Sequence, residues 1–302
     1  MPEGLLLSLP LPGALLKAEP VRRGWSAERK YRLSVSGGGD LLLRVRAGDG
    51  GEAHRLEYEF VRALSGRGLA VPAAHAFGTL PGGAGSWMLL DWVEGEDLAN
   101  ALPALPEWEQ HRLGLDAGEL LRGIHATQPP AGTPPARPAA RKAVDKLRRI
   151  EESGIRIDHM EIIADFVREH LDWLDLLPPG CRHGDFHPGN MVLSPGGKLY
   201  AIDFNRWDVG DPAEEFSRVQ SFTVECSIPF ARGQVDGYFG GPAAPGFWEA
   251  LAVHVAVTSL YSVLWALPFG DEEVLGMQAR CARAFKDYDG FRATVPAWYS
   301  SV

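Results

Sequence analysis

The stretch from residue 181 to residue 212 reads CRHGDFHPGNMVLSPGGKLYAIDFNRWDVGDP. Its pattern predicts a strand at 191–193, a tight turn at 194–197 and a second strand at 199–204. These elements form a short hairpin, which is set among segments of helical periodicity. The polar residues of the stretch are concentrated at the two ends of this hairpin.

Three oxygen-bearing side chains, Asp185, Asn190 and Asp203, flank the hairpin. Because a hairpin folds back, the loop before it and the residues that close it lie at one end, so we expect the three to converge. Oxygen ligands without thiolates suit a hard cation such as Mg²⁺, which completes its coordination with water and phosphate. A further carboxylate that stays off the metal can accept a proton from a substrate hydroxyl.

The N-terminal region, residues 1–93, has the pattern of a small sheet that carries one helix. A hairpin comes first, then the helix, and then two strands around a glycine-rich turn. The expected strands are 30–35, 41–45, 71–77 and 87–93, and the expected helix covers 56–64.

From residue 94 to residue 302, helical periodicity dominates. The expected helices are 107–126, 141–153, 160–177, 213–226 and two segments that start near Trp248 and Asp271. The chain is therefore expected to be an α+β protein with two lobes. The first is small and β-rich (1–93), and the second is larger and mostly helical (94–302).

Composition narrows the function further. The chain has 302 residues, 45% of them apolar, which supplies a sizeable core and excludes wholesale disorder. Its formal net charge of −9 disfavours nucleic acid as a partner and favours a cationic ligand. Three widely separated cysteines fit neither a disulfide framework nor a paired-cysteine metal site, so a reducing, cytoplasmic location is expected.

Two apolar segments were considered as targeting or membrane sequences. Residues 4–16 lack a basic leading region and contain two prolines, which predicts a strand or helix packed on the body of the protein. Residues 250–270 carry no charged side chain, but they include His254 and Pro268 and have no basic flank. We therefore expect a buried core helix and no membrane partner.

The run HGDFHPGN, followed by IDF, resembles the catalytic loop and metal-binding strand of the aminoglycoside phosphotransferase and choline kinase-like family, distant relatives of protein kinases. Other segments follow the order of that family. They are Gly24 to Ser26, LLLRV at 41–45, the helix with Glu57, VP at 71–72, MLLDWVEGEDL at 88–98, LLRGIHA at 120–126 and DPAEEF at 211–216.

The resemblance implies a bilobal protein-kinase-like fold and the transfer of a phosphoryl group from ATP or GTP to a hydroxyl. Asp185 would be the catalytic base or would orient the hydroxyl, and Asn190 and Asp203 would hold Mg²⁺ against the nucleotide phosphates. The acceptor would be a small, cationic molecule, an aminoglycoside first, which would make the protein an antibiotic resistance enzyme. A monomer or weak dimer is expected.

The nucleotide-binding residues depart from the family pattern at several points. Arg44 stands where many kinases have a lysine, and Glu57 is its expected ion-pair partner. The turn that would cover the phosphates contains Ser26. Backbone groups of Asp91 to Val93, between the lobes, would bind the nucleotide base. Asn205 replaces the glycine that follows the aspartate–phenylalanine pair in protein kinases.

The acceptor site is the least defined part of the sequence. Glu225, Asp271 and Glu272 are candidate carboxylates for an amine-rich substrate, although acids at helix ends are often solvated or capping. His183 is expected to brace the loop as a buried, hydrogen-bonded histidine rather than to act as a ligand.

Three alternatives remain open from the sequence. One is a metabolic kinase of choline, an amino alcohol or a sugar. Another is a non-catalytic nucleotide-binding module, which the departures at Arg44 and Asn205 would permit. A third reads His183 and Asp185, with His187 or a distant histidine, as the iron site of a non-haem oxygenase. On a strand, residues 183, 185 and 187 would share one face.

Overall fold

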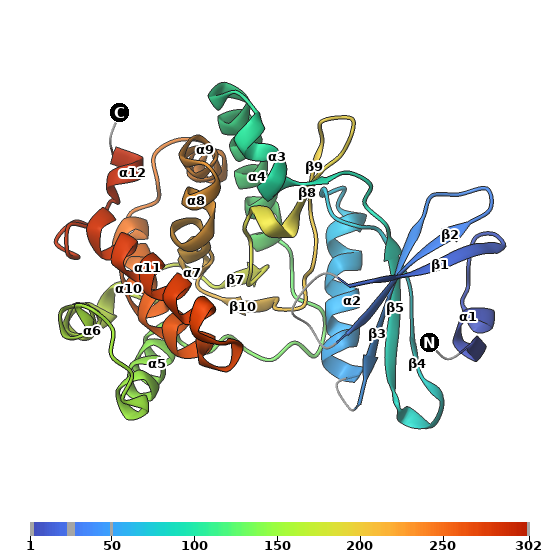
Figure 1. Ribbon diagram of the computed structural model, residues 1–302, viewed down its shortest axis with the longest axis horizontal. Helices are drawn as coiled ribbons and strands as arrows, with labels where there is room; N and C mark the ends of the chain where they lie inside the picture. The colour runs from blue at the N-terminus through green and yellow to red at the C-terminus, as the bar shows by residue number, and fades with distance from the viewer. Residues whose placement is uncertain (1–2, 23–27, 49–50, 301–302) are drawn as a thin grey trace. The chain divides into compact units, whose positions relative to one another are not determined.

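A computed structural model describes residues 3–22, 28–48 and 51–300 (Figure 1). The chain divides into two compact units. The first comprises residues 1–96, 129–133 and 192–205, and the second comprises 97–128, 134–191 and 206–302. The sequence interpretation assigned 192–205 to the helical lobe, whereas this hairpin packs with the N-terminal residues. Asp203 therefore belongs to the first unit.

The first unit is built on a five-stranded antiparallel sheet with the order β1-β2-β3-β5-β4 (Figure 1). Its strands are β1 (Leu15–Val21), β2 (Arg29–Val35), β3 (Leu41–Ala47), β4 (Ala74–Thr79) and β5 (Gly85–Asp91). Alternate residues of neighbouring strands, among them Leu33, Leu43 and Leu89, are completely buried on one face. Leu5 of the helix α1 (Glu3–Ser8) and Leu9, which follows this helix, join the same core.

The helix α2 (Gly51–Gly66) packs against β4 and β5. It buries Leu56, Phe60 and Leu64, the helical spacing from which the sequence predicted it. The ring of Phe60 lies 6.0 Å from that of Phe204 (centroid to centroid), so the 192–205 segment is anchored on this helix. The remaining elements of this unit are η1 (Pro81–Gly83), β8 (Met191–Leu193) and β9 (Leu199–Ala201), with β6 (Glu96–Asp97) beside β8.

The second unit is mostly helical. Its longer helices are α4 (Glu107–His125), α5 (Ala139–Ser153), α6 (Met160–Glu169), α9 (Ile228–Phe239), α10 (Phe247–Ala266) and α11 (Asp271–Asp287). Its short elements are α3 (Leu98–Ala101), η2 (Leu102–Ala104), η3 (Leu171–Trp173), β7 (Gly180–Arg182), η4 (Pro188–Asn190), β10 (Asp208–Gly210), α7 (Pro212–Glu215), η5 (Val219–Thr223), α8 (Val224–Cys226), η6 (Leu267–Phe269) and α12 (Ala297–Ser300).

The backbones of helices α4 and α9 pack directly against each other. A Cβ atom on Gly114 or Gly118 of α4 would overlap a carbonyl oxygen of α9, and one on Gly233 or Gly237 would overlap a carbonyl oxygen of α4. Larger residues at these four positions would push the helices apart. Helix α9 was not predicted from the sequence, and its N-terminus is capped by Ser227, whose hydroxyl accepts a hydrogen bond from the amide of Phe230 (2.9 Å).

The apolar segment near residue 250 forms α10, which is long and apolar enough to cross a membrane by length and composition. Most of its side chains are buried inside the second unit, where it packs against α5, α6 and α11. Its arrangement is that of a core helix, as the sequence predicted. Another prediction was wrong in detail, because the expected helix 213–226 is divided into α7, the π-helical turn η5 and α8.

Candidate functional site

The loop between β7 and η4 holds Asp185 and Asn190 together in the second unit. The amide nitrogen of Asn190 donates hydrogen bonds to the backbone oxygen of Asp185 (2.9 Å) and to its carboxylate Oδ2 (3.2 Å). These bonds fix the rotamer of Asn190 and leave its amide oxygen as the atom that can meet a cation. The predicted proximity of these two residues is therefore present.

Two arginines and a histidine surround the carboxylate of Asp185, which is 19% exposed. Arg218 Nε lies 3.3 Å from Oδ1, Arg206 Nη1 lies 3.6 Å from Oδ2, and His187 Nε2 lies 3.8 Å from Oδ1. Burial by itself would raise the pKa of Asp185, but His187, Arg218 and Arg206 outweigh it and hold that pKa well below its usual value. Asp185 is thus an ionised hydrogen-bond acceptor at neutral pH.

A completely buried carboxylate, that of Glu215, braces the same loop. It accepts hydrogen bonds from the backbone amides of Gly184 (2.9 Å) and Phe186 (3.1 Å), on either side of Asp185. Burial opposes its ionisation, but His125 and His183 outweigh this effect and lower the pKa of Glu215 to about 2. Glu215 therefore sets the backbone on which Asp185 is presented.

Glu215 is in turn positioned by the start of α7. The carboxylate of Asp211 caps this helix by accepting a hydrogen bond from the amide of Ala213 (2.9 Å), and it also contacts His254 Nε2 of α10 (2.9 Å). Next to the loop, Arg182 of β7 binds both carboxylate oxygens of Asp208 of β10 (2.8 and 2.7 Å). Buried polar contacts thus connect the loop to the core of the second unit.

Gly184 permits the close approach of two segments of the loop region. Its φ is +81°, and a Cβ atom there would overlap the backbone oxygen of Arg206. Any larger residue would displace either Asp185 or Arg206.

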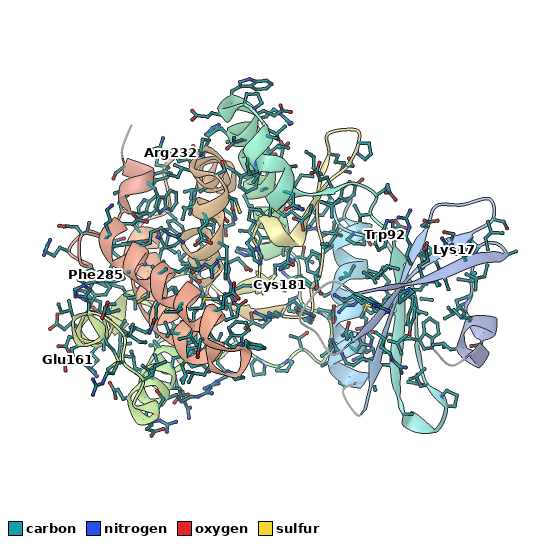
Figure 2. The ribbon with its side chains drawn as sticks, viewed as in Figure 1. Lys17, Trp92, Glu161, Cys181, Arg232 and Phe285 are labelled. Carbon is teal, nitrogen blue, oxygen red and sulfur yellow. The ribbon has the colours of Figure 1, made fainter. Side chains whose placement is uncertain are left out.

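Cys181, on β7 just before the loop, is labelled in Figure 2, and burial raises the pKa of its thiol to about 11.

The histidines of the loop support it and do not form an iron site. His183 is completely buried, and its Nδ1 accepts a hydrogen bond from the amide of Asp185 (3.3 Å), the bracing role expected from the sequence. His187 caps η4 by accepting from the amide of Gly189 (3.1 Å). Because β7 ends at Arg182, residues 183–187 are not on a strand, which removes the geometric basis of the oxygenase alternative.

In the first unit, Asp203 has two cationic neighbours. Lys30 Nζ lies 3.0 Å from its Oδ2, and Arg44 Nη2 lies 3.8 Å from its Oδ1. Its backbone has a φ of +66°, a left-handed conformation that Asp adopts more readily than most residues. The convergence of Asp203 with Asp185 and Asn190 stays a prediction.

The predicted pair of Arg44 on β3 and Glu57 on α2 forms in the structure, and it is part of a larger network. Arg44 Nη1 donates to Glu57, while its Nε donates to Glu28 Oε2 (2.7 Å). Arg46 contacts the same two glutamates, with Nε donating to Glu28 Oε1 (2.7 Å). Burial would lower the pKa of Arg44, but Glu57 and Glu28 outweigh it and raise that pKa above its usual value.

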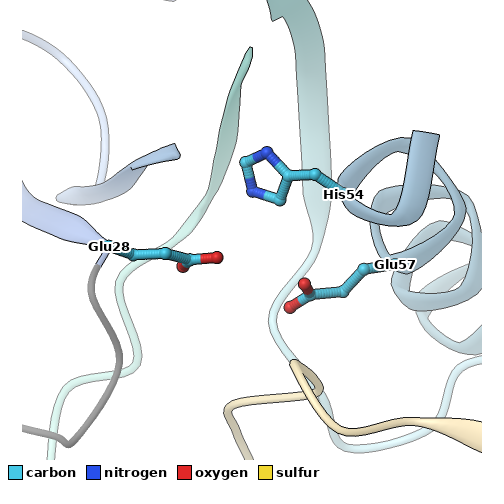
Figure 3. A group of neighbouring side chains, drawn as sticks. All are labelled: Glu28, His54 and Glu57. Carbon is cyan, nitrogen blue, oxygen red and sulfur yellow. The ribbon is translucent and has the colours of Figure 1, made fainter. Parts of the chain in front are cut away.

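Glu28, His54 and Glu57 point toward one another (Figure 3), and their ligand atoms lie within 4.8 Å of one another. Such a set can in principle bind a metal. Here, however, Arg44 and Arg46 already neutralise the two carboxylates. Burial lowers the pKa of His54 to about 4, so this ring is neutral and hydrogen-bonded to Ser86 Oγ (2.7 Å). The cluster is a balanced structural network and not a cation site.

The remaining predicted nucleotide residues have different outcomes. Ser26 lies outside the described residues. Asp91 is at the end of β5, where its carboxylate contacts His75 Nε2 (2.6 Å), so its side chain links β5 to β4 within the sheet. Val93 follows β5 in irregular backbone and is partly exposed.

The predicted acceptor residues lie in different surroundings. Glu225 does not offer a solitary carboxylate, because Arg280 Nη2 (2.9 Å) and Arg283 Nη1 (2.7 Å) both bind it. Two cations on one anion make this spot unsuitable for an additional positive charge. Asp271 and Glu272 are exposed in the first turn of α11, where they complement the helix dipole.

Four residues of the site region were missed as functional candidates: Lys30, Arg206, Arg218 and Glu215. Glu215 entered the sequence analysis only as part of the segment 211–216, since sequence does not show which amides a carboxylate reaches. Lys30 carried a usable signal. The predicted hairpin pairs two strands whose polar residues alternate with apolar ones, which places Lys30 on the same face as Arg44.

Comparison with known proteins identifies the class. A sequence profile described as "Phosphotransferase enzyme family" matches residues 17–250. The chain therefore belongs to this family, and it is a small-molecule phosphotransferase. A search of curated proteins finds no match.

The fold of the chain is similar to the folds of several solved structures. A choline/ethanolamine kinase family protein from Mesorhizobium loti superposes with a TM-score of 0.69 at 19% identity, covering 99% of this chain and 98% of that one. A thermostable mutant of aminoglycoside phosphotransferase APH(4)-Ia gives 0.68 at 16% identity, with 92% and 96% covered. The GDP and kanamycin complex of APH(2")-IIia gives 0.65 at 19% identity, with 90% and 94% covered. The chain has the kinase-like bilobal α+β fold.

Proposed function

We propose that this phosphotransferase moves the γ-phosphoryl group of ATP or GTP to a hydroxyl of a small molecule, with Asp185 as the residue that accepts the hydroxyl proton. The observation that carries the proposal is the state of Asp185. It is ionised, partly exposed, bound to Asn190 and held on a loop braced by Glu215. An ionised carboxylate in this setting can orient a hydroxyl for in-line attack and take its proton.

Asn190 and Asp203 would hold Mg²⁺, since the set of an amide oxygen and a carboxylate fits a hard divalent cation. The amide nitrogen of Asn190 is already used by Asp185, which supports its oxygen as the ligand atom. When bound, Mg²⁺ would neutralise charge on the transferring phosphate oxygens. Lys30 and Arg44 place positive charge beside the Asp203 carboxylate, 3.0 and 3.8 Å away.

The nucleotide would lie against the first unit. Backbone groups from Asp91 to Val93 would hydrogen-bond the base, and Ser26 would contact a phosphate. Arg44 and Glu57 would support this surface from within the sheet and α2, because both side chains are almost completely buried. Neighbouring structures were solved with ADP and with GDP, which supports a purine nucleotide donor and leaves both donors to be tested.

An aminoglycoside is the first acceptor to test. Two structural neighbours were solved with hygromycin B and with kanamycin, and the chain's net charge of −9 favours a cationic ligand. Resistance to such an antibiotic would follow from its phosphorylation. The choline/ethanolamine kinase family neighbour supports amino alcohols as the second acceptor class. A cytoplasmic location accords with the reduced state of Cys181, Cys226 and Cys281 in the described chain.

A coupled assay of nucleoside diphosphate release tests the function. The purified protein is supplied with MgATP or MgGTP and a panel of aminoglycosides, amino alcohols, choline and sugars. We expect acceptor-dependent turnover with at least one compound. Nucleotide binding without turnover across the whole panel would instead favour the non-catalytic module.

A further inference from the structure

Lys30 on β2 and Arg44 on β3 are direct cross-strand partners. The antiparallel register pairs Lys30 with Arg44 and Tyr31 with Leu43. Side chains of directly opposed residues lie on the same face of a sheet, with Cβ atoms about 5 Å apart. Leu43 is buried in the core on the other face, so Lys30 and Arg44 share the face that carries the charged network. The two cations therefore reach the same region from neighbouring strands.

The guanidinium of Arg44 is committed to protein carboxylates. Its Nε donates to Glu28 (2.7 Å) and its Nη1 binds Glu57, while its Nη2 lies 2.6 Å from Glu28 and 3.8 Å from Asp203 as an ion-pair contact. Its side chain is 3% exposed, and those of the two glutamates are 4% and 2% exposed. With Arg46, the group contains two positive and two negative charges and is balanced. A ligand phosphate would have to displace a buried carboxylate to bind Arg44, which is unfavourable.

Lys30 is differently placed. Its side chain is 11% exposed, and within the part of the chain that the structure describes it forms an ion pair with Asp203, 3.0 Å away. Asp203 is 22% exposed, the most accessible carboxylate in this group. When the carboxylate of Asp203 coordinates a metal ion, its negative charge no longer balances the ammonium of Lys30. A phosphate oxygen supplies that charge.

We infer that Lys30 is the side chain that binds the phosphate groups of the nucleotide, and that Arg44 is a structural residue. The inference rests on the proposed function. A lysine ammonium suits this task because it carries three donors on a compact charge, so it can contact Asp203 and a phosphate at once. The phosphate-binding cation would thus stand on β2, although the sequence comparison pointed to β3.

Calorimetry separates phosphate binding from a structural role. Lys30→Met should weaken ATP or GTP binding by about 10- to 100-fold, the range expected for a lost charged hydrogen bond. The loss should be smaller without Mg²⁺, when Asp203 still balances the charge of Lys30, and affinity for the matching nucleoside, which has no phosphate, should stay unchanged. Lys30→Arg should recover part of the loss. Lys17→Met is the matched control, since Lys17 lies on the edge strand β1 with a side chain that is 63% exposed (Figure 2).

Equal losses for nucleotide and nucleoside, or no loss for either, would overturn the inference. Arg44→Lys should lower the melting temperature and change nucleotide affinity less than threefold. A larger effect of Arg44→Lys than of Lys30→Met on phosphate affinity, in folded protein, would assign the role to Arg44 instead.

Chemical labelling of the unmodified protein gives an independent test. The probe is an ATP or GTP derivative with an acyl group on the terminal phosphate oxygen. The neutral amine of a nearby lysine attacks the acyl carbonyl. A C–N bond forms, the C–O bond to phosphate breaks, the nucleotide leaves as its phosphate anion and the amine proton passes to solvent. Peptide mass spectrometry should find the acyl group on Lys30, and excess unmodified nucleotide should suppress it there but not on Lys17.

The outcomes distinguish the inference from the function on which it rests. If wild-type protein binds nucleotide by calorimetry while Lys30 stays unlabelled, the inference is wrong and the function stands. If wild-type protein binds neither ATP nor GTP, the proposed function fails and the inference fails with it.

Discussion

The two units of the protein hold their charges in different ways. In the first, Arg44, Arg46, Glu28 and Glu57 form a compact network in which Arg44 and both glutamates are almost wholly buried and Arg46 is 24% exposed. In the second, Asp185 keeps partial exposure, and its arginine neighbours stay 3.3 and 3.6 Å away. A balanced buried network maintains a shape, whereas a loosely paired, accessible carboxylate retains the capacity to accept a proton. The Lys30–Asp203 pair resembles the second kind, although it lies in the first unit.

The largest expected effect concerns Asp185. Asp185→Asn should lower kcat by about 10²- to 10⁴-fold, because the proton acceptor is lost while the shape is kept. Nucleotide affinity should change little. The control is Asp165→Asn on the exposed side of α6, where Asp165 pairs only with nearby arginine in the described chain. Steady-state kinetics with calorimetry measures both quantities, and wild-type turnover by Asp185→Asn would contradict the assigned role.

Disrupting the network of Arg44, Arg46, Glu28 and Glu57 should lower the stability of the fold more than the rate of the reaction. Glu57→Gln leaves Arg44 buried beside a neutral partner and should lower the free energy of unfolding by about 3–5 kcal/mol. Glu52→Gln is the matched control on the same helix, since Glu52 is 67% exposed, and it should cost less than about 1 kcal/mol. Urea denaturation measures both, and equal costs would mean that the network contributes no special stability.

Glu215 shares a feature with each kind of charged group. It is buried like the arginine–glutamate network, and it supports the loop that carries Asp185. Glu215→Gln loses one of the two amide contacts, and we expect a loss of about 1–3 kcal/mol in unfolding free energy. A fall in kcat of about tenfold should accompany it, with KM nearly unchanged. A stability loss without any change in kcat would show that the loop keeps its geometry without this carboxylate.

The same residue predicts a pH dependence. Its pKa of about 2 in the folded protein lies below the ordinary value of 4.5, so ionised Glu215 stabilises the fold above about pH 4.5. This contribution is lost as the pH falls from about 4.5 to 2. The difference in unfolding free energy between wild type and Glu215→Gln should therefore shrink across that interval. A difference that is constant over this range would contradict the assigned ionisation.

The smallest effect is expected at Glu225. Because Arg280 and Arg283 both bind it, Glu225→Gln should change KM for a cationic acceptor by less than about threefold. A selective increase in KM for cationic acceptors, absent for neutral ones, would instead show that Glu225 takes part in acceptor binding.

Local sequence patterns predicted much of the fold. The hairpin of β2 and β3, the helix α2 and the long helices of the second unit other than α9 follow from periodicity, although the expected helix 160–177 ends at Glu169, and the pair Arg44–Glu57 follows from spacing. The edge strand β1 and the helix α9 were missed, as was the break within 213–226. The pairing of β1 with β2 and the glycine-mediated approach of α4 and α9 are long-range contacts, which local patterns do not encode.

The candidate site was predictable where residues lie close in sequence. Asp185 and Asn190 are five positions apart and meet across one loop. The contribution of Glu215, about thirty positions later, depends on how α7 turns back to the loop amides. Lys30 and Asp203 are 173 positions apart, so their contact comes from tertiary folding alone. The charge pattern of a strand indicates that Lys30 is on the polar face, but not which carboxylate it meets.

Phosphorus NMR of the reaction products tests the central claim most directly. Wild-type protein, MgATP or MgGTP and the acceptor selected from the panel should yield a phosphomonoester signal on the acceptor, in step with formation of the nucleoside diphosphate. Under the same conditions, Asp185→Asn should bind nucleotide as tightly and form the ester at least 100-fold more slowly. Formation of the ester at an equal rate by both proteins, or of inorganic phosphate alone, would contradict the account.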